Sequence, residues 1–378
     1  MFSNKMDRRK FMKNLSATLL GATATPLLGG ASFGQSGQGV KNEYRTLGKT
    51  GLKVTSVSMG VMNCSDPAVL LRAFDLGINF FDTADCYMGG RNEEMVGKAF
   101  EGKRQKVVIQ TKVHDGDAKK MRASVDRSLR RLRTDYIDVL LWHGHSSPKE
   151  VSDPKLFEFM SQMKKEGKVR FTGFSSHSHM ASLLREAAKS NLHDVALVSY
   201  NFTHSKELKE AVAMAAQTGI GIVAMKTQAG GYKKKKMGNL TPHQAALKFV
   251  LMDPNVSTTV PGVTTIEQIE ECAAVMGTSF SKKDFDELKQ YQAFLQGRIC
   301  TMCGGCVGEC PYDIPHQDLL RLVMYHDAYE NDLLIKETSG IAMQQSIQRC
   351  LECSSCSVHC RRGVDIQAQI KFAGHLLS

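Results

Sequence analysis

The stretch AKKMRASVDRSLRRLRTDYIDVLLWHG, residues 118–144, decides the fold. Its first part, 118–132, spaces apolar side chains three and four residues apart, which is typical of an amphipathic helix. Its second part, 136–144, is a short apolar run, which is typical of a strand buried on both faces. A helix followed closely by such a strand predicts an α/β fold with a parallel sheet.

The same alternation continues over residues 50–280. Apolar runs that predict strands occupy 55–60, 79–85, 107–113, 136–144, 171–177, 195–201, 221–226 and 257–263. Stretches that predict helices occupy 66–77, 92–101, 118–132, 154–167, 180–190, 205–219, 241–253 and 265–277. Eight strands that each lead into a helix close into a barrel, so we expect a (β/α)8 TIM barrel whose active site lies at the carboxyl ends of the strands.

Polar residues gather at these predicted strand ends. They are Asp82, Tyr87, Lys112, His143, Ser175, Ser176, Tyr200, Asn201 and Lys226. A lysine in an apolar strand usually extends its ammonium to water. A buried lysine beside a carboxylate and a phenol instead favours an acid–base site, because such neighbours perturb one another's pKa values.

Eight of the eleven cysteines form two runs near the C-terminus. The runs are CTMCGGCVGECP (300–311) and CLECSSCSVHC (350–360), and the second repeats the first fifty positions later. Each run has the spacing C-x2-C-x2-C-x3-C, which the bacterial [4Fe-4S] ferredoxins use. The spacing predicts two [4Fe-4S] clusters, with Cys300, Cys303, Cys306, Cys310, Cys350, Cys353, Cys356 and Cys360 as the metal ligands.

Two alternatives exist for these cysteines. Zinc would use four ligands and leave the remaining cysteines of each run without a role. Disulfides between cysteines so close in sequence would be strained. If the fourth cysteine crosses over, as in two-cluster ferredoxins, then one cluster uses Cys360 with the first three cysteines of the first run, and the other uses Cys310 with those of the second. The segments between the runs have helical spacing, so the tail resembles the all-helical two-cluster ferredoxin domains.

The N-terminus predicts export. The segment DRRKFMK (7–13) precedes the mildly apolar, acid-free stretch NLSATLLGATATPLLGGASFG (14–34), the order of a cleaved export signal. Paired arginines followed by Phe11 resemble a twin-arginine signal, which implies export of a folded protein to the periplasm. The stretch is too short and weakly apolar for a stable membrane span.

Five motifs resemble those of the aldo-keto reductase family. They are YRTLGKTGLKVTSVSMG (44–60), FFDTADCY (80–87), VVIQTK (107–112), SVDRSLRRLRTDYIDVLLWH (124–143) and GKVRFTGFSS (167–176). The resemblance implies a catalytic tetrad of Asp82, Tyr87, Lys112 and His143. Tyr87 would exchange a proton with the carbonyl or alcohol oxygen, and we expect the Lys112 ammonium to lower its pKa. Asp82 would pair with Lys112, and His143 would orient the carbonyl or donate to it.

The resemblance is weaker on the cofactor side. It implies that Ser175 and Ser176 contact a nicotinamide, with Tyr200, Asn201 and Lys226 nearby, but Ser176 replaces the usual asparagine. Apolar Leu197 takes the place of the usual glutamine, and Met225 that of the usual stacking aromatic. Gly262 and Gln268 replace the bases that contact the adenosine 2′-phosphate. Binding of NAD(P) is therefore left open.

We divide the chain into a twin-arginine signal (1–34), a barrel (43–280) and a helical extension with the two cluster motifs (281–378). With a net charge of +11 and no long basic run interleaved with aromatic residues, we expect no nucleic-acid partner. We predict an exported oxidoreductase that interconverts a small-molecule carbonyl and alcohol, a sugar being one candidate, and exchanges electrons with a redox partner protein. Two alternatives are a non-catalytic barrel that carries an electron-transfer domain, and a metal site formed by HGH (143–145) and SSHSHM (175–180).

Overall fold

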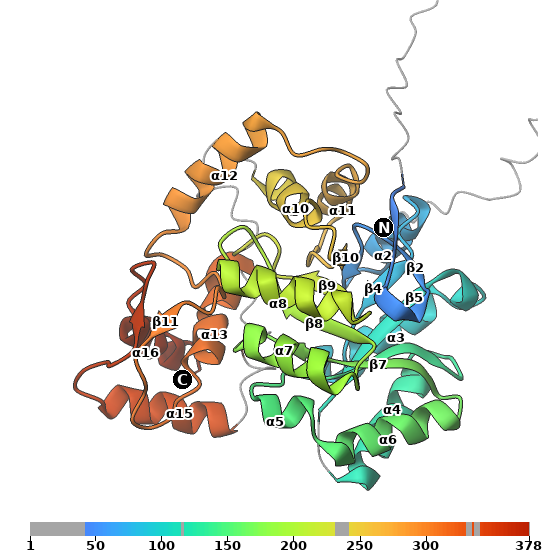
Figure 1. Cartoon of the computed structure of the whole chain (residues 1–378), viewed down its shortest axis with the longest axis horizontal. Helices are drawn as coiled ribbons and strands as arrows, with labels where there is room; N and C mark the ends of the chain where they lie inside the picture. The colour runs from blue at the N-terminus through green and yellow to red at the C-terminus, as the bar shows by residue number, and fades with distance from the viewer. Residues whose placement is uncertain (1–41, 115–116, 231–241, 330–334, 336–340, 378) are drawn as a thin grey trace, which may run out of the picture. The chain divides into compact units, whose positions relative to one another are not determined.

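A computed structural model describes residues 42–114, 117–230, 242–329, 335 and 341–377; the predicted signal at 1–34 lies outside them. In the described part of the chain, eight parallel strands form one sheet with the order β10-β9-β8-β7-β6-β5-β4-β3 (Figure 1). The strands are β3 (Met59–Gly60), β4 (Phe80–Asp82), β5 (Val108–Val113), β6 (Ile137–Trp142), β7 (Val169–Ser176), β8 (Val195–Ser199), β9 (Gly221–Met225) and β10 (Val256–Thr259). Bridges between Val57 and Thr259 and between Gly60 and Gly262 bring β3 beside β10, so the predicted barrel is confirmed.

Helices follow these strands, as the periodicity predicted. They are α2 (Pro67–Asp75), α3 (Arg91–Ala99), α4 (Ala118–Arg131), α5 (Pro148–Val151), α6 (Pro154–Lys165), α7 (Met180–Ser190), α8 (Lys206–Gln217), α10 (His243–Leu251) and α11 (Ile266–Ala273). Several begin at a residue whose side chain accepts a hydrogen bond from the first turn, such as Asp117 before α4 and Ser205 before α8. The hairpin β1 (Tyr44–Thr46) and β2 (Lys53–Thr55) precedes the barrel.

The C-terminal extension has its own hydrophobic core. Its elements are α12 (Lys282–Leu295), β11 (Cys306–Val307), α13 (His316–Tyr329), α15 (Ile341–Glu352), β12 (His359–Cys360) and α16 (Ile366–Leu377). Helices α13 and α15 both pack against α16 around residues such as Leu319, Leu322 and Ile370. We call residues 298–377 the tail below, because α12 instead packs on α10 of the barrel.

Several contacts fix the extension to the barrel. Tyr291 in α12 donates its hydroxyl to the Gln228 carbonyl oxygen at 2.9 Å. In the loop before β11, the Thr301 carbonyl oxygen accepts from Asn201 Nδ2 at 3.2 Å, and the Thr301 hydroxyl accepts from the Thr203 hydroxyl at 3.0 Å. The first cysteine run is therefore tied to the end of β8.

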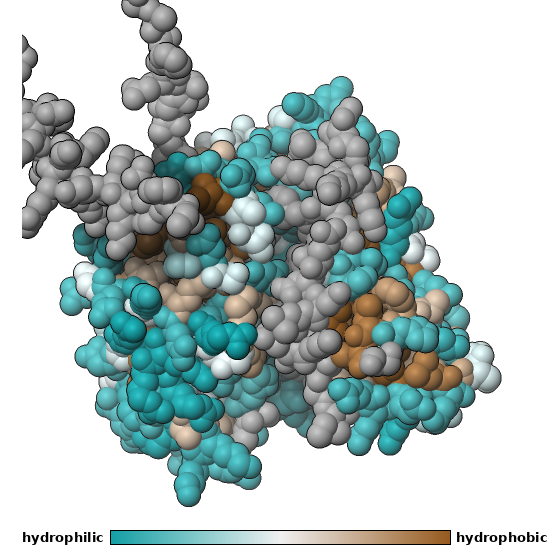
Figure 2. Space-filling model, turned by 180° about the vertical axis from the view of Figure 1, so that it is seen from behind, coloured by the Kyte–Doolittle hydropathy of each residue, from teal (hydrophilic) through white to brown (hydrophobic). Residues whose placement is uncertain are grey.

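No helix among the described residues is long and apolar enough to cross a bilayer. Apolar side chains do reach the surface of the tail, where Leu351 and Phe372 are each 39% exposed. Figure 2, the view from behind, shows a hydrophobic patch on the tail's side of the molecule.

Candidate active site

Three neighbouring strands bring the four predicted tetrad residues together. Asp82 ends β4, Lys112 lies in β5, His143 follows β6, and Tyr87 begins a short 3-10 helix after β4. The Lys112 ammonium lies 2.8 Å from Asp82 Oδ1 and donates to the Tyr87 hydroxyl oxygen at 3.3 Å. The ring centroids of Tyr87 and His143 are 5.8 Å apart. Lys112 is 1% exposed and Asp82 6% exposed, so the ion pair is buried.

The strand register explains how these groups meet. Gln110 and Lys112 lie two residues apart in β5 and therefore share one face of the sheet. Both donate to Asp82, Gln110 through Nε2 at 2.7 Å and Lys112 through Nζ at 2.9 Å. The chain after β4 is held by hydrogen bonds from the Asp85 amide to the Lys112 carbonyl oxygen and from the Tyr87 amide to the Ala84 carbonyl oxygen. These bonds turn Tyr87 back toward the ammonium.

The pKa of Tyr87 differs from our sequence-based expectation. Burial, followed by the negative charge of Asp82, raises this pKa well above its usual value. Our expectation of a lowered pKa was wrong, because the Asp82 carboxylate offsets the Lys112 charge and little water reaches the phenol. Tyr87 is therefore protonated at neutral pH and is suited to donate a proton.

His143 is suited to donate a neutral hydrogen bond. Burial, followed by the charge of Lys112, lowers the pKa of His143 well below its usual value, so the imidazole is uncharged at neutral pH. Cys86 Sγ lies 3.6 Å from His143 Nδ1, and burial raises the pKa of this thiol to about 12. A protonated thiol beside Nδ1 favours the tautomer in which Nε2 carries the ring proton.

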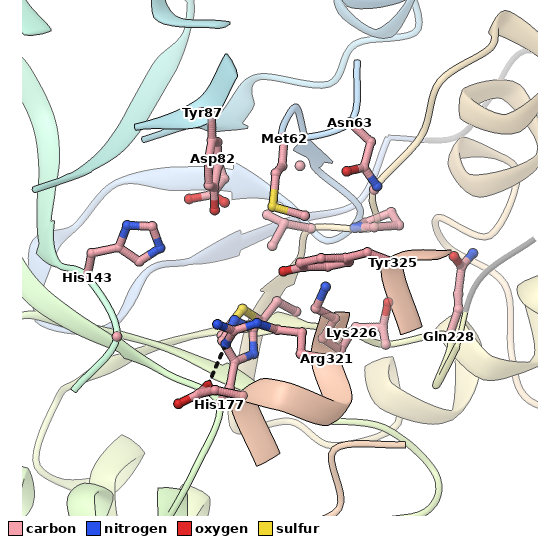
Figure 3. A pocket seen from close by; sticks show the side chains of 18 of the residues that line it. Met62, Asn63, Asp82, Tyr87, His143, His177, Lys226, Gln228, Arg321 and Tyr325 are labelled. Atoms are coloured by element: carbon pink, nitrogen blue, oxygen red, sulfur yellow. Dashed lines mark ion pairs between the residues drawn. The ribbon is translucent and has the colours of Figure 1, made fainter. Parts of the chain in front are cut away.

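A cavity of about 360 Å³ lies over the tetrad. The barrel lines it with residues from the ends of its strands, including Met62, Asn63, His177, Met225, Lys226, Gln228 and Gly262. The tail lines it with Asp318, Arg321 and Tyr325 of α13 and Met343 of α15. Figure 3 looks into this cavity, with Asp82, Tyr87 and His143 on one side and Arg321 and His177 across from them. The site is therefore built by both parts of the chain.

Sequence reasoning missed the contribution of α13. Asp318, Arg321 and Tyr325 are spaced three and four residues apart, so they share one face of the helix. The neighbouring Leu319 and Leu322 are fully buried in the tail core. A polar face on an otherwise apolar helix was the available signal, but nothing in the sequence indicates that this face meets the strand ends of the barrel.

The predicted cofactor residues lie in different environments. Lys226 lines the cavity, whereas Ser175, Ser176, Tyr200 and Asn201 are not among its lining residues. Ser175 Oγ donates to the Trp142 carbonyl oxygen, and Ser176 Oγ donates to that of His145.

The remaining two predicted cofactor residues support the structure around the cavity. Tyr200 donates its hydroxyl to Asp253 at 2.6 Å, and Asn201 Nδ2 donates to the Lys226 and Thr301 carbonyl oxygens. Asn201 thus links the strand end to the tail. Contact of these two side chains and the two serines with a nicotinamide stays a prediction.

The alternative metal site does not form as the sequence suggested. His145 is 4% exposed, and its Nδ1 lies 3.5 Å from Glu150, so it points away from His143. Residues two apart share a face only while a strand continues, and β6 ends at Trp142, before His143 and His145. Among the described residues, the structure instead groups Cys86, His114 and His143, whose ligand atoms all lie within 4.8 Å of one another.

The tail cysteines form two groups of four. Burial raises the pKa of Cys300, and the neighbouring charges that raise it further belong to Cys306, Cys303 and Cys360. The same four residues line one small cavity in the tail.

The second group is built in the same way. Burial is the main cause of the raised pKa of Cys350, and the neighbouring charges that raise it further belong to Cys356, Cys353 and Cys310. β11 pairs Cys306 directly with Cys360, which brings the ends of the two runs together. All eight thiols are free of disulfides, and two groups of four thiols fit two [4Fe-4S] clusters in the crossed pattern.

Comparisons with known proteins agree with this geometry. The model of the aldo/keto reductase family matches residues 63–239 and 233–293, and that of the 4Fe-4S dicluster domain matches 285–365. The L-galactose dehydrogenase of Arabidopsis thaliana is 27% identical over 307 residues, covering 68% of this chain and 95% of that protein. The L-glyceraldehyde 3-phosphate reductase of Escherichia coli K12 is 26% identical over 324 residues, covering 66% of this chain and 92% of that protein.

Solved structures agree as well. Aldo-keto reductase AKR11C1 from Bacillus halodurans, in its holo form, superposes with a TM-score of 0.56 at 26% identity, and covers 66% of this chain and 96% of its own. The chain belongs to the aldo-keto reductase family, and is an oxidoreductase that carries a C-terminal 4Fe-4S dicluster domain.

Proposed function

We propose that this oxidoreductase is exported, interconverts a carbonyl and an alcohol in the barrel cavity, and exchanges electrons with a partner protein through two [4Fe-4S] clusters. The observation that carries the proposal is the shared cavity, in which α13 of the cluster domain lines the same space as Tyr87 and His143. A tail that served only as an independent electron carrier would have no reason to contribute buried side chains to the barrel's reactive end.

The chemistry follows from the protonation states of the tetrad. Reduction of a carbonyl to an alcohol consumes two electrons and two protons. Tyr87 donates a proton to the carbonyl oxygen and takes one back in the reverse direction, while the neutral His143 donates a hydrogen bond to the same oxygen. Lys112 keeps a positive charge beside the phenolate that forms, and Asp82 keeps that ammonium in place. A nicotinamide would supply hydride chemistry in this cavity, and the clusters would supply single electrons.

A sugar is our candidate substrate. The support is the Arabidopsis relative named L-galactose dehydrogenase, which matches 68% of this chain. Polar groups around the cavity, such as Asn63, His177 and Gln228, provide several hydrogen-bonding partners for hydroxyl groups. A panel of aldoses and ketoses, assayed anaerobically in both directions, tests this part of the proposal, and activity confined to non-sugar carbonyls would contradict it.

Released cofactor tests the electron route. The holoprotein is purified anaerobically and denatured in acid, and the nicotinamide dinucleotide and iron that are released are quantified. About one nicotinamide per chain beside about eight irons would establish a captive cofactor next to two clusters. About eight irons without nicotinamide would mean that the cofactor is taken from solution or that electrons reach the substrate by another route.

Cysteine substitutions should remove the clusters in the crossed pattern. We expect Cys303→Ser combined with Cys360→Ser to keep about four irons per chain, because both ligands serve one cluster. Cys303→Ser combined with Cys350→Ser should keep almost none. Iron analysis with electron paramagnetic resonance measures this, and Cys272→Ser in the barrel is the matched control. Equal iron loss in the two double variants would argue against the crossed ligand sets.

The pH–rate profile of carbonyl reduction should lack the usual histidine step. His143 has a lowered pKa and is neutral on both sides of pH ~6.5, where a free imidazole titrates. Tyr87 has a raised pKa and stays protonated beyond pH ~10, where a free phenol ionises. We therefore expect a flat profile for kcat/KM from about pH 6 to 9. An inflection between about pH 6 and 7 that disappears in His143→Gln would contradict the neutral donor.

Export through the twin-arginine route rests on the sequence DRRKFMK at 7–13. Clusters are assembled in the cytoplasm, so a route for folded proteins suits a chain with two cluster motifs. The double variant Arg8→Lys, Arg9→Lys should leave the uncleaved precursor in the cytoplasmic fraction, whereas Lys13→Arg should not. Unchanged periplasmic yield of the double variant would contradict this route.

A further inference from the structure

We propose that Arg321 of the tail anchors a carboxylate of the substrate, so that the enzyme acts on carbonyl compounds that carry a carboxylate near the reacting group. This inference rests on the proposed carbonyl–alcohol chemistry, and it assigns to the cluster domain a direct part in substrate recognition.

The helix aims Arg321 into the cavity. Its neighbours Leu320 and Leu322 are 2% and 0% exposed and belong to the tail core, so α13 directs those side chains inward. Arg321 lies on the face of α13 that meets the barrel, and its side chain is 15% exposed. Figure 3 shows the guanidinium beside Lys226 and His177.

The guanidinium is only partly paired. Arg321 Nη1 lies 2.9 Å from Asp318 Oδ1, three residues earlier on the same helix. Its buried Nε has no hydrogen-bond acceptor among the described residues. An arginine carries five N–H donors in a planar fork that matches the two oxygens of a carboxylate, and unsatisfied buried donors are costly. A bound carboxylate would satisfy this deficit.

A second basic side chain faces the same space. Lys226 Nζ lies 4.8 Å from the centroid of the Tyr325 ring, which also comes from α13. The Lys226 backbone adopts a left-handed conformation with φ 54°, and its carbonyl oxygen accepts from Asn201 Nδ2 and from the Ala229 amide. Non-glycine residues rarely adopt this conformation, and such strain is concentrated at functional sites. The Arg321 guanidinium and the Lys226 amine line the same cavity, and both can donate hydrogen bonds to an anion there.

Arg321 faces the proton-transfer groups across the cavity. Burial is the main cause of the lowered pKa values of His177 and Lys226, and the charge of Arg321 comes next for both. The same charge opposes the rise in the pKa of Tyr87, which burial and Asp82 cause. Arg321 and Tyr87 also line the same cavity, so the guanidinium faces the group that transfers the proton. A phosphate of a dinucleotide cofactor would also suit a guanidinium, but the proximity to Tyr87 favours the substrate.

Matched pairs of ligands test the proposal. The anaerobic holoprotein is titrated with D-galacturonate and D-galactose, which differ in a carboxylate, and with glyoxylate and glycolaldehyde. Affinity is measured by calorimetry, and KM and kcat are measured wherever turnover occurs. We expect the carboxylated member of at least one pair to bind about 10- to 100-fold more tightly, and Arg321→Gln to remove that difference. Arg321→Lys should restore part of it, because it keeps the charge but loses the fork.

Controls separate this proposal from the proposed function. Arg185→Gln changes an arginine that pairs with Glu207 on the barrel surface, and it should leave all affinities unchanged. Iron content and visible absorbance report whether each variant keeps its clusters, and dinucleotide affinity is measured in parallel. The inference would be overturned if neither pair showed a preference for the carboxylated member. It would also be overturned if Arg321→Gln weakened the affinity for the dinucleotide instead of that for the carboxylated compound. Both results would leave the carbonyl chemistry standing. Absence of turnover with every carbonyl compound would overturn both.

Discussion

Tyr87→Phe is expected to lower carbonyl turnover by about 100- to 10,000-fold, the range that a general acid contributes. The phenol oxygen accepts a hydrogen bond from the Lys112 ammonium at 3.3 Å, and the raised pKa of the phenol keeps the proton on it at neutral pH. Phenylalanine keeps the ring and its packing against His143 but removes the proton. Substrate affinity should change little, so the loss should fall on kcat.

Anaerobic steady-state kinetics measures this effect in both directions. Tyr136→Phe is the matched control, because the Tyr136 ring packs against the Arg104 guanidinium, 4.1 Å from its centroid, and lies outside the cavity. Iron content should be the same in the wild type and both variants. A Tyr87→Phe enzyme that retains turnover within about tenfold of the wild type would show that Tyr87 is not the proton donor. A wild type without turnover would favour the alternative in which the barrel only carries an electron-transfer domain.

The sequence predicted the barrel well because most of its strands are continuous runs buried on both faces. The run at 136–144, for example, becomes β6 over Ile137–Trp142, in which every residue is buried. Local patterns suffice for such elements, since hydrophobic periodicity and capping residues agree. The two groups of cysteines were predictable because their spacing matches that of two-cluster ferredoxins, in which the fourth cysteine crosses over.

The tail's contribution to the active site was not predictable. Arg321 and Tyr325 reach the cavity only because α13 packs across the barrel's carboxyl end, and no local pattern specifies that packing. Asn201 illustrates the same point, since its position at a strand end suggested a cofactor contact while its side chain bonds to Thr301. The pKa of Tyr87 also depends on burial under the tail, which spacing does not indicate.

Lys112→Met is expected to lower the free energy of unfolding of the barrel by about 3–5 kcal/mol. Lys112 is almost fully buried, and its ammonium bonds to Asp82 and to the Thr83 carbonyl oxygen at 2.7 Å. Methionine has a similar shape but leaves Asp82 charged and without its cation inside the protein. Removing both charges with Lys112→Met and Asp82→Asn should recover much of the loss, because no buried charge then lacks its partner.

The only tryptophan, Trp142, makes this measurement specific to the barrel, since it lies in β6 beside the site and is 2% exposed. Denaturant unfolding followed by its fluorescence therefore reports the barrel rather than the clusters. Arg122→Met breaks an ion pair of 2.6 Å with Glu166 on the surface and should cost far less, because water screens exposed ion pairs. If Lys112→Met cost no more than that control, the pair would be solvated rather than buried. The Lys112 ammonium would then not be the fixed charge on which proton transfer by Tyr87 depends.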